Sequence, residues 1–224
     1  MHKDLIKWFF NENGLDRNAA PPSAAQEHFH IRLLLENISF EDILDGPVVK
    51  GMPEREQALL AEKEEIESAA DVDQLIRIMR RGADIMNQQA LVRRALDFAD
   101  EIIPVVIKML KTSMNELFIE LSTRILAVCD MDISGELIRV YEEVRSPFAK
   151  SMILVALGFK AGEKRIPWIM KRYKELRLSH PGEDYCYGAY YALLEMERRF
   201  YLEDEKFRMD TGLGPSIDNA SQSG

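Results

Sequence analysis

An apolar pattern that recurs four times in the middle of the chain constrains the fold more than any other feature of the sequence. Each copy places small or apolar side chains at positions i, i+3, i+4 and i+7, which lie on one face of an α-helix. The copies begin at Leu75, Ile103, Leu137 and Ile166. One more helix fits between consecutive copies, so the sequence predicts a unit of two helices in about 30 residues. That period is typical of an α-solenoid, and a helical bundle with coincidental spacing is the alternative.

Start signals between these copies also predict helices. We expect the intervening helices at roughly residues 84–99, 114–129 and 147–160. Residues 71–74 and 113–116 each fit a capping box, in which the first side chain accepts a backbone N–H and the fourth side chain reaches back. Ser146 precedes Pro147, and proline is tolerated at the first position of a helix. Because no segment shows the sustained alternation of a strand, the sequence predicts an all-α fold.

Residues 146–169 contain the clearest copy of the unit. Ser146-Pro147 opens its first helix, Ala156-Leu157-Gly158 closes that helix and Ile166-Pro167 opens the second. In this order of motifs the segment resembles a HEAT repeat of the bilin-lyase-like class, with serine where that family has aspartate. A further Ile103-Pro104 fits the start of another second helix. We expect Gly158 to end its helix in the left-handed conformation, which glycine adopts without steric cost.

The resemblance covers about residues 71–200 and implies a right-handed α-solenoid of HEAT-like helix pairs. It also implies that the second helix of each pair lines a concave face, which in this family usually binds another protein. The chain then divides into an N-terminal helical capping region (1–70), HEAT-like repeats (71–205) and a flexible C-terminal tail (206–224). We expect the apolar cluster at residues 5–10 to cover the first repeat, and a membrane-surface anchor is the alternative.

The helices that carry the apolar stripe bear basic side chains on their other side. Two, five and eight residues after each stripe begins, the sequence has eight basic residues, one acid and one tryptophan. The positions two and five residues on point away from the core of a helix with this stripe. We expect these side chains to form ladders along the concave face and to bind an acidic segment, with a tryptophan as hot spot. The predicted binding residues are Trp168, Lys164, Lys171, Arg172, Lys174, Arg139, Lys108, Arg77 and Arg80.

Two other interpretations of these side chains stay open. In the first, the basic residues form an ordinary solvated helix face; in the second, Trp168 packs against the neighbouring repeat. The acidic ligand has a candidate within the chain, because residues 54–67 hold six glutamates. The net charge of −9 argues against a general binder of polyanions, although residues 71–181 carry a charge of +3.

The function expected from this pattern is a non-catalytic protein–protein interaction module or scaffold in the cytoplasm, without a cofactor. The alternative is a HEAT-like nucleic-acid enzyme of the alkylbase DNA glycosylase type, which needs a strongly basic groove. The overall acidity of this chain opposes that alternative. No apolar run reaches the roughly 18 residues that a membrane-spanning helix needs.

Metal and thiol chemistry find little support in the sequence. Deoxyhypusine hydroxylase, a HEAT-like iron enzyme, binds its metal through His-Glu pairs, and none of the four histidines here is followed by glutamate. His28 and His30 lie two residues apart, so on a helix their rings do not converge on one metal ion. Cys129 and Cys186 lie in apolar helical contexts and are expected to be buried small side chains.

The predicted tail provides a first test. It contains Gly212, Gly214 and Pro215 followed by polar residues, with few apolar side chains to dock on a core. Truncation after Asp210 is therefore expected to leave the Tm nearly unchanged in a thermal melt followed by circular dichroism. A fall of several degrees would show that the tail packs on the helices.

Overall fold

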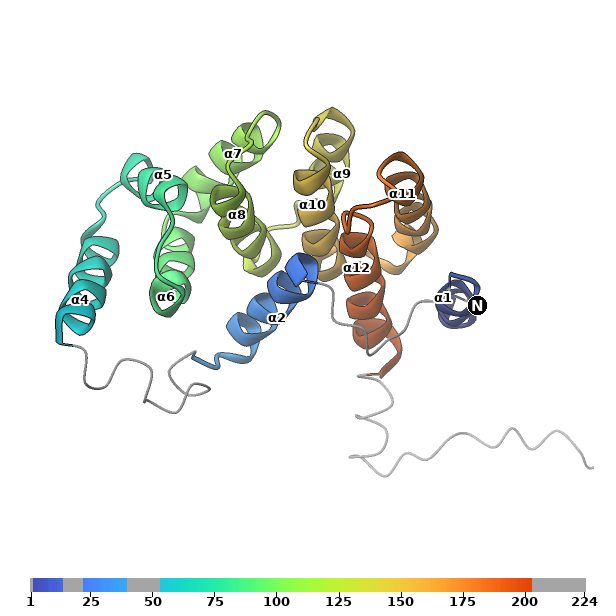
Figure 1. Ribbon diagram of the computed structural model, residues 1–224, viewed down its shortest axis with the longest axis horizontal. Coiled ribbons are helices and arrows are strands. Elements are labelled where there is room, and N and C mark those ends of the chain that lie inside the picture. The colour runs from blue at the N-terminus through green and yellow to red at the C-terminus, as the bar shows by residue number, and fades with distance from the viewer. Residues whose placement is uncertain (1, 14–21, 40–52, 203–224) are drawn as a thin grey trace, which may run out of the picture.

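The computed structural model describes residues 2–13, 22–39 and 53–202, and the structural statements that follow concern these residues (Figure 1). Within them the chain forms eleven α-helices and no strand, which confirms the all-α prediction. The α-helices are α1 (His2–Glu12), α2 (Pro22–Glu36), α4 (Pro53–Ser68), α5 (Val72–Arg81), α6 (Ile85–Leu96), α7 (Ala99–Leu110), α8 (Glu116–Val128), α9 (Ser134–Glu143), α10 (Pro147–Lys160), α11 (Ile166–Ser179) and α12 (Tyr187–Glu197). A short 3-10 helix, η1 (Glu163–Arg165), precedes α11, and a π-helical turn, η2 (Arg198–Leu202), follows α12.

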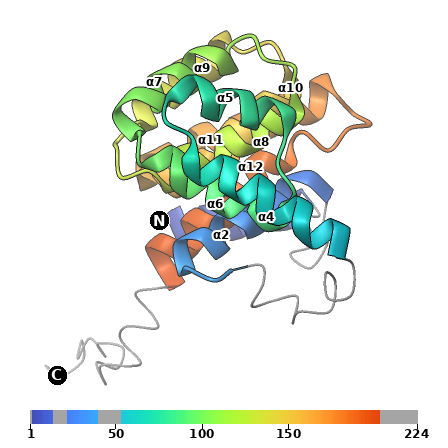
Figure 2. The ribbon, with the colours of Figure 1, turned by 90° about the vertical axis from the view of Figure 1, so that its left-hand side faces the viewer.

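From α5 onward, consecutive helices alternate between two rows (Figure 1). An outer row holds α5, α7, α9 and α11, and an inner row holds α6, α8, α10 and α12. The rows curve into an arch, and α2 lies on its inner side against α8, α10 and α12. Figure 2 shows the same order from the end of the arch, with α5, α7 and α9 far from α2 and the inner helices between them.

The apolar stripes lie at the boundary between the two rows. Leu75, Ile103, Leu137 and Ile166, the first residues of the four stripes, are each no more than 1% exposed. The residues three, four and seven positions further on are also buried, apart from a partly buried Gly82. The side chains five residues after each stripe begins are all exposed. The period read from the sequence therefore identifies correctly which side of each outer helix is buried.

The cap residues confirm most of the predicted helix starts. Asp71 Oδ1 accepts the backbone N–H of Gln74 at 2.8 Å, and Ser146 Oγ accepts that of Ala149 at 3.2 Å. The predicted box at residues 113–116 is shifted by two residues, because Asn115 provides the cap by accepting the N–H of Phe118 at 2.9 Å. The capping atom is therefore the side-chain oxygen of Asn115 and not the predicted hydroxyl of Ser113.

Two predictions about proline and glycine are wrong. Pro104 lies inside α7, which begins at Ala99, so it does not open a helix. Gly158 does not end α10 and has no positive φ, since the helix continues to Lys160. Pro167 does lie in the first turn of α11, as predicted, and residues 161–165 separate α10 from that helix.

Gly158 instead permits close contact between α10 and α12. A Cβ atom on Gly158 would lie 2.6 Å from the Cα of Ala192, a distance that real Cβ atoms do not reach. On the other helix, a Cβ on Gly188 would lie 2.1 Å from the carbonyl oxygen of Ser151. Two glycines, one on each helix, therefore let two backbones of the inner row touch.

The ends of the arch are covered, but not in the way the sequence predicted. Phe9 and Phe10 of α1 are buried, as expected for a capping cluster. They pack edge-on against Tyr173 of α11 and Tyr190 of α12, each with 5.1 Å between ring centroids. The cluster at residues 5–10 thus covers the last helix pair, and the prediction that it covers the first is wrong. The first pair is covered by α4, which packs on α6.

The contact between α10 and α12 generates a stability prediction. Gly188→Ala is expected to lower the free energy of unfolding by about 2 kcal/mol or more, because overpacked backbone cannot shift as a flexible side chain does. Gly162→Ala is the matched control, since a Cβ added at Gly162 would have no atom within 4 Å and its φ is negative. Urea unfolding followed by circular dichroism measures both. Equal stability of the two variants would contradict the close packing of α10 on α12.

Candidate functional site

The predicted binding residues lie on the outer row of helices, not on the inner side of the arch. Arg77 and Arg80 belong to α5, Lys108 to α7 and Arg139 to α9. The remaining five belong to η1 and α11: Lys164, Trp168, Lys171, Arg172 and Lys174. The expectation that these helices line the concave face is therefore wrong, because α6, α8, α10 and α12 occupy that side (Figure 1).

The number of apolar sides on each helix explains which helices occupy the inner side of the arch. In α10, all residues from Ser151 to Phe159 are buried, and in α8 all residues from Leu121 to Ala127 are buried. Helices that are apolar on most sides need neighbours on most sides, so they lie between the outer row and α2. The stripe helices bury one side only, and their other side faces solvent on the outside of the arch.

Most of the predicted basic side chains are exposed along this outer surface. Arg80, Lys108 and Lys171 stand five residues after the start of their stripes, and Arg77 and Arg139 stand two residues after it, while Glu142 takes the fifth position on α9. We call the following set the outer basic row: Arg77, Arg80, Lys108, Arg139, Lys164, Lys171 and Lys174, all of which are exposed.

Trp168 and Arg172 depart from the prediction. Trp168 is partly buried, with its ring edge-on to Tyr141 of α9 at 5.2 Å between centroids. The Arg172 guanidinium lies 4.9 Å from the Trp168 ring centroid and forms ion pairs with Glu142 and Glu175. Both side chains thus join α11 to α9. For Trp168 this is the alternative that the sequence left open, in which the ring packs against the neighbouring helices. Arg172 is not part of the exposed row.

The inner side of the arch carries a different set of charged groups, centred on α2. The carboxylate of Glu27 accepts two hydrogen bonds from the Arg124 guanidinium of α8, at 2.7 Å from Nε and 2.5 Å from Nη2. Both side chains are at most 3% exposed. Gln88 of α6 accepts a third hydrogen bond from Arg124. A charged pair that is removed from water in this way is held by its own geometry and is costly to break.

Burial and neighbouring charge have opposite effects on the acids of this cluster. Burial opposes ionisation of Glu27, but the hydrogen bonds from Arg124 and the nearby side chains of Arg124 and His30, whose Nδ1 lies 3.7 Å from Glu27 Oε1, hold its pKa below the ordinary value. Glu120, one turn before Arg124 on α8, lacks such hydrogen bonds. Burial, reinforced by the negative charge of Glu27, raises the pKa of Glu120 to about 7.

A second cluster fixes the same helix to α12. His28 Nε2 lies 3.0 Å from Glu195 Oε2, and the centroid of the His28 ring lies 5.4 Å from those of Phe159 and Tyr191. Arg198 also donates to Glu195, at 2.5 Å. Burial opposes ionisation of Glu195, yet these two partners hold its pKa below the ordinary value.

Sequence reasoning missed Arg124, Glu120 and Glu195 as site residues. A signal for the first two is present, because Glu120 and Arg124 stand four residues apart in an otherwise mainly apolar helix. That spacing puts both on one side of α8, where charged groups facing a core need partners. The partner itself, Glu27, is about one hundred positions earlier in the chain, and no local pattern reveals it.

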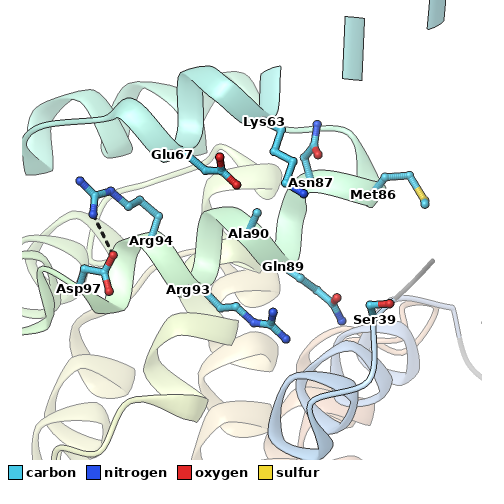
Figure 3. A pocket seen from close by; sticks show the side chains of 10 residues that line it. All are labelled: Ser39, Lys63, Glu67, Met86, Asn87, Gln89, Ala90, Arg93, Arg94 and Asp97. Atoms are coloured by element: carbon cyan, nitrogen blue, oxygen red, sulfur yellow. Dashed lines mark hydrogen bonds and ion pairs between the residues drawn. The ribbon is translucent and has the colours of Figure 1, made fainter. Parts of the chain in front are cut away.

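A cavity of about 450 Å³ opens beyond the end of α2, between α4 and α6 (Figure 3). Lys63 and Glu67 line it from α4, and Arg93 lines it from α6. Arg93 donates to Asn37 at 2.8 Å, while Arg94 on the same helix donates to Asp97 at 2.9 Å. The cavity is polar, and its arginines already have partners within the chain.

The remaining sequence predictions concern metals, thiols and membranes. His28 and His30 contact different acids, Glu195 and Glu27, and do not converge. Cys129 and Cys186 are buried, as predicted. In the part of the chain that the structure describes, no group of three or more His, Cys, Asp or Glu residues is placed to hold a metal ion. Nor is any helix of those residues long and apolar enough to cross a bilayer. The predicted tail, residues 206–224, lies outside the described residues.

No protein-family model matches the sequence, and it matches neither a curated protein nor a solved structure.

The raised pKa of Glu120 generates a prediction about pH. Between pH 4.5, the ordinary pKa of a glutamate, and about pH 7, Glu120 keeps its proton in the folded chain but loses it in the unfolded chain. The stability of the fold therefore decreases as the pH rises through this range. Glu120→Gln removes this loss. We expect the variant to gain on the order of 1 kcal/mol at pH 8, a value reduced for the solvent that reaches Glu120, and little at pH 5.

Thermal melts at the two pH values measure the difference, which corresponds to a rise in Tm of about 2–4 °C at pH 8. Glu64→Gln, on an exposed position of α4, is the control and should not change the pH dependence. An equal shift at both pH values for Glu120→Gln would rule out ionisation of this side chain as the cause.

Proposed function

We propose that this protein is a non-catalytic protein-interaction module, an α-solenoid of right-handed, HEAT-like helix pairs that binds an acidic segment of a partner. One observation carries the proposal: each of the four outer helices presents an exposed basic side chain along the outer basic row. Arg80, Lys108 and Lys171 stand five residues after the start of their stripes, whereas α9 has Glu142 there and presents Arg139 one turn earlier. Stacked repeats present such rows as extended surfaces, which suit an extended ligand better than a compact one.

The acidic segment is assigned to the outer surface because α2 already covers the inner one. On the outer surface, Lys108 of α7, Arg139 of α9 and Lys171 of α11 stand on three successive outer helices. Each exposed ion pair contributes only about 0.5 kcal/mol, so a single contact has little effect on binding. The contributions of several ion pairs along one segment add up, and the resulting binding free energy decreases as the salt concentration rises.

Part of the row is already neutralised within the chain. Lys171 Nζ lies 3.8 Å from Glu175 Oε1, and Lys111, which flanks the row, pairs with Glu143 at 2.9 Å. An acidic segment therefore competes with these intramolecular acids. This competition favours a ligand with several carboxylates in sequence over one with a single acid.

A charge-reversal experiment tests the proposal. The variant Lys108→Glu, Arg139→Glu, Lys171→Glu is expected to bind a fluorescein-labelled, glutamate-rich peptide about tenfold more weakly, from three exposed pairs of about 0.5 kcal/mol each. Its remaining binding should depend less on salt. Fluorescence anisotropy at low and high salt measures both quantities.

The control keeps the same change in net charge but places it elsewhere. Lys7→Glu, Arg55→Glu and Lys63→Glu together alter exposed positions of α1 and α4 and should leave most of the affinity. Equal loss in both triple variants would mean that net charge alone acts, which contradicts a defined surface. If duplex DNA binds more tightly than the peptide and its binding collapses with salt, the glycosylase-type alternative replaces this proposal.

A further inference from the structure

Helix α2 and the two residues after it contact every helix of the inner row. Glu27 binds Arg124 of α8, and His28 contacts both Phe159 of α10 and Glu195 of α12. Further along, two side chains of α6 hold the segment by its backbone and side chain. Gln89 donates to the carbonyl of Ile38 at 2.8 Å, and Arg93 donates to Asn37 at 2.8 Å. The segment of α2 and the two residues after it thus crosses the inner side of the arch (Figure 1).

The contacts of α2 differ in kind from those inside the two rows. Between the rows, the buried residues of the four stripes are all apolar side chains or tyrosines. Under α2, the ion pair Glu27–Arg124 is buried, and the buried carboxylate of Glu195 contacts a half-buried His28. The apolar set beside them is small: Ala24, Ile31 and Leu33. Interfaces within a chain that are this polar resemble those of proteins that associate and dissociate.

Arg124 imposes a strict condition on anything that covers this surface. Removing one partner of a buried ion pair leaves an uncompensated buried charge, which is far more costly than replacing the pair. A helix that takes the place of α2 and covers Arg124 must therefore present another carboxylate at the position of Glu27. A helix without that carboxylate is rejected, so the arginine selects the ligand as well as holding it.

We propose that the inner face of α8, α10 and α12 is a helix-binding groove, which α2 occupies as an internal ligand until a helix of a partner protein replaces it. The partner helix presents a small residue, a glutamate three positions later and a branched aliphatic residue four positions after that. This is the pattern of Ala24, Glu27 and Ile31, the buried side of α2. The surface and the ligand are distinct from the outer basic row and its acidic segment.

Because α2 belongs to the same chain, its effective concentration at the groove is high, of millimolar order for a short connection. A partner helix must compete with α2 for the groove. Its apparent affinity is its intrinsic affinity multiplied by the fraction of molecules in which α2 has left the groove. Weakening α2 alone should thus reveal the groove without any change in the groove itself.

The test uses the full chain and, as probe, a fluorescein-labelled peptide of residues 22–39. Glu27→Ala in the chain removes the carboxylate of the internal ligand but leaves Arg124 in the groove. We expect this variant to bind the peptide at least tenfold more tightly than the unaltered chain does. A peptide that itself carries Glu27→Ala should lose at least tenfold on the same variant. Fluorescence anisotropy measures each affinity.

Glu36→Ala is the matched control, since Glu36 is exposed at the end of α2 and pairs with Arg32 of the same helix. It should bind the peptide no better than the unaltered chain. A folded Glu27→Ala chain that does not bind the peptide overturns the proposal. If the unaltered chain dimerises and the peptide dissolves the dimer, the occupant is α2 of a second copy, and the partner-protein assignment is wrong.

Hydrogen exchange on the unaltered chain provides a result even if Glu27→Ala does not fold. The amides of α2 should exchange through an opening that leaves those of α8 and α10 protected. Exchange of α2 only together with α8 and α10 would make it an integral part of the core and overturn the proposal. Neither outcome depends on the outer basic row, whose triple variant should bind the α2 peptide as the unaltered chain does.

Discussion

The packing of α10 is the constraint on which the positions of the other helices depend. All nine residues from Ser151 to Phe159 of this helix are buried, so the helix needs neighbours in every direction. It has α8 and α12 beside it in the inner row, α9 outside it and α2 inside it. Its contact with α12 is the closest, because Gly158 and Gly188 remove the side chains that would hold the two backbones apart.

Stacking of this kind leaves two ends and one inner surface to be covered. The first 68 residues supply all three covers: α4 on α6, α1 on α11 and α12, and α2 across the inner row. Their order along the chain differs from their order along the arch. The segment nearest the N-terminus packs on the last pair of helices, where Phe9 meets Tyr173. The N-terminal region therefore depends on the whole arch and not only on its first pair.

How much of this fold the sequence predicts depends on the distance over which each pattern acts. The stripes beginning at Leu75, Ile103, Leu137 and Ile166 repeat within a few turns, and they identify the helices and their buried sides correctly. The caps at Asp71 and Ser146 are equally local. The stripes do not say which row is inside, because a buried side faces its neighbour in either arrangement.

The breadth of the apolar surface, rather than its period, carries the information about the rows. Residues 118–127 are buried almost throughout, so α8 belongs between two layers. Long-range partners have no local signal at all. Glu27 and Arg124, and likewise His28 and Glu195, meet only after the chain has folded, and the predicted site missed them for that reason.

The two proposed surfaces differ in how charge acts on them. The chain carries a net charge of −9, so at long range it repels an acidic partner. Screening at physiological salt confines each charge to about 8 Å, and the outer basic row therefore attracts only a segment that already lies along it. At the groove, charge acts within a space from which water is excluded. There a single carboxylate opposite Arg124 decides whether a helix is accepted, and the affinity of that contact should be much less sensitive to salt than that of the outer row.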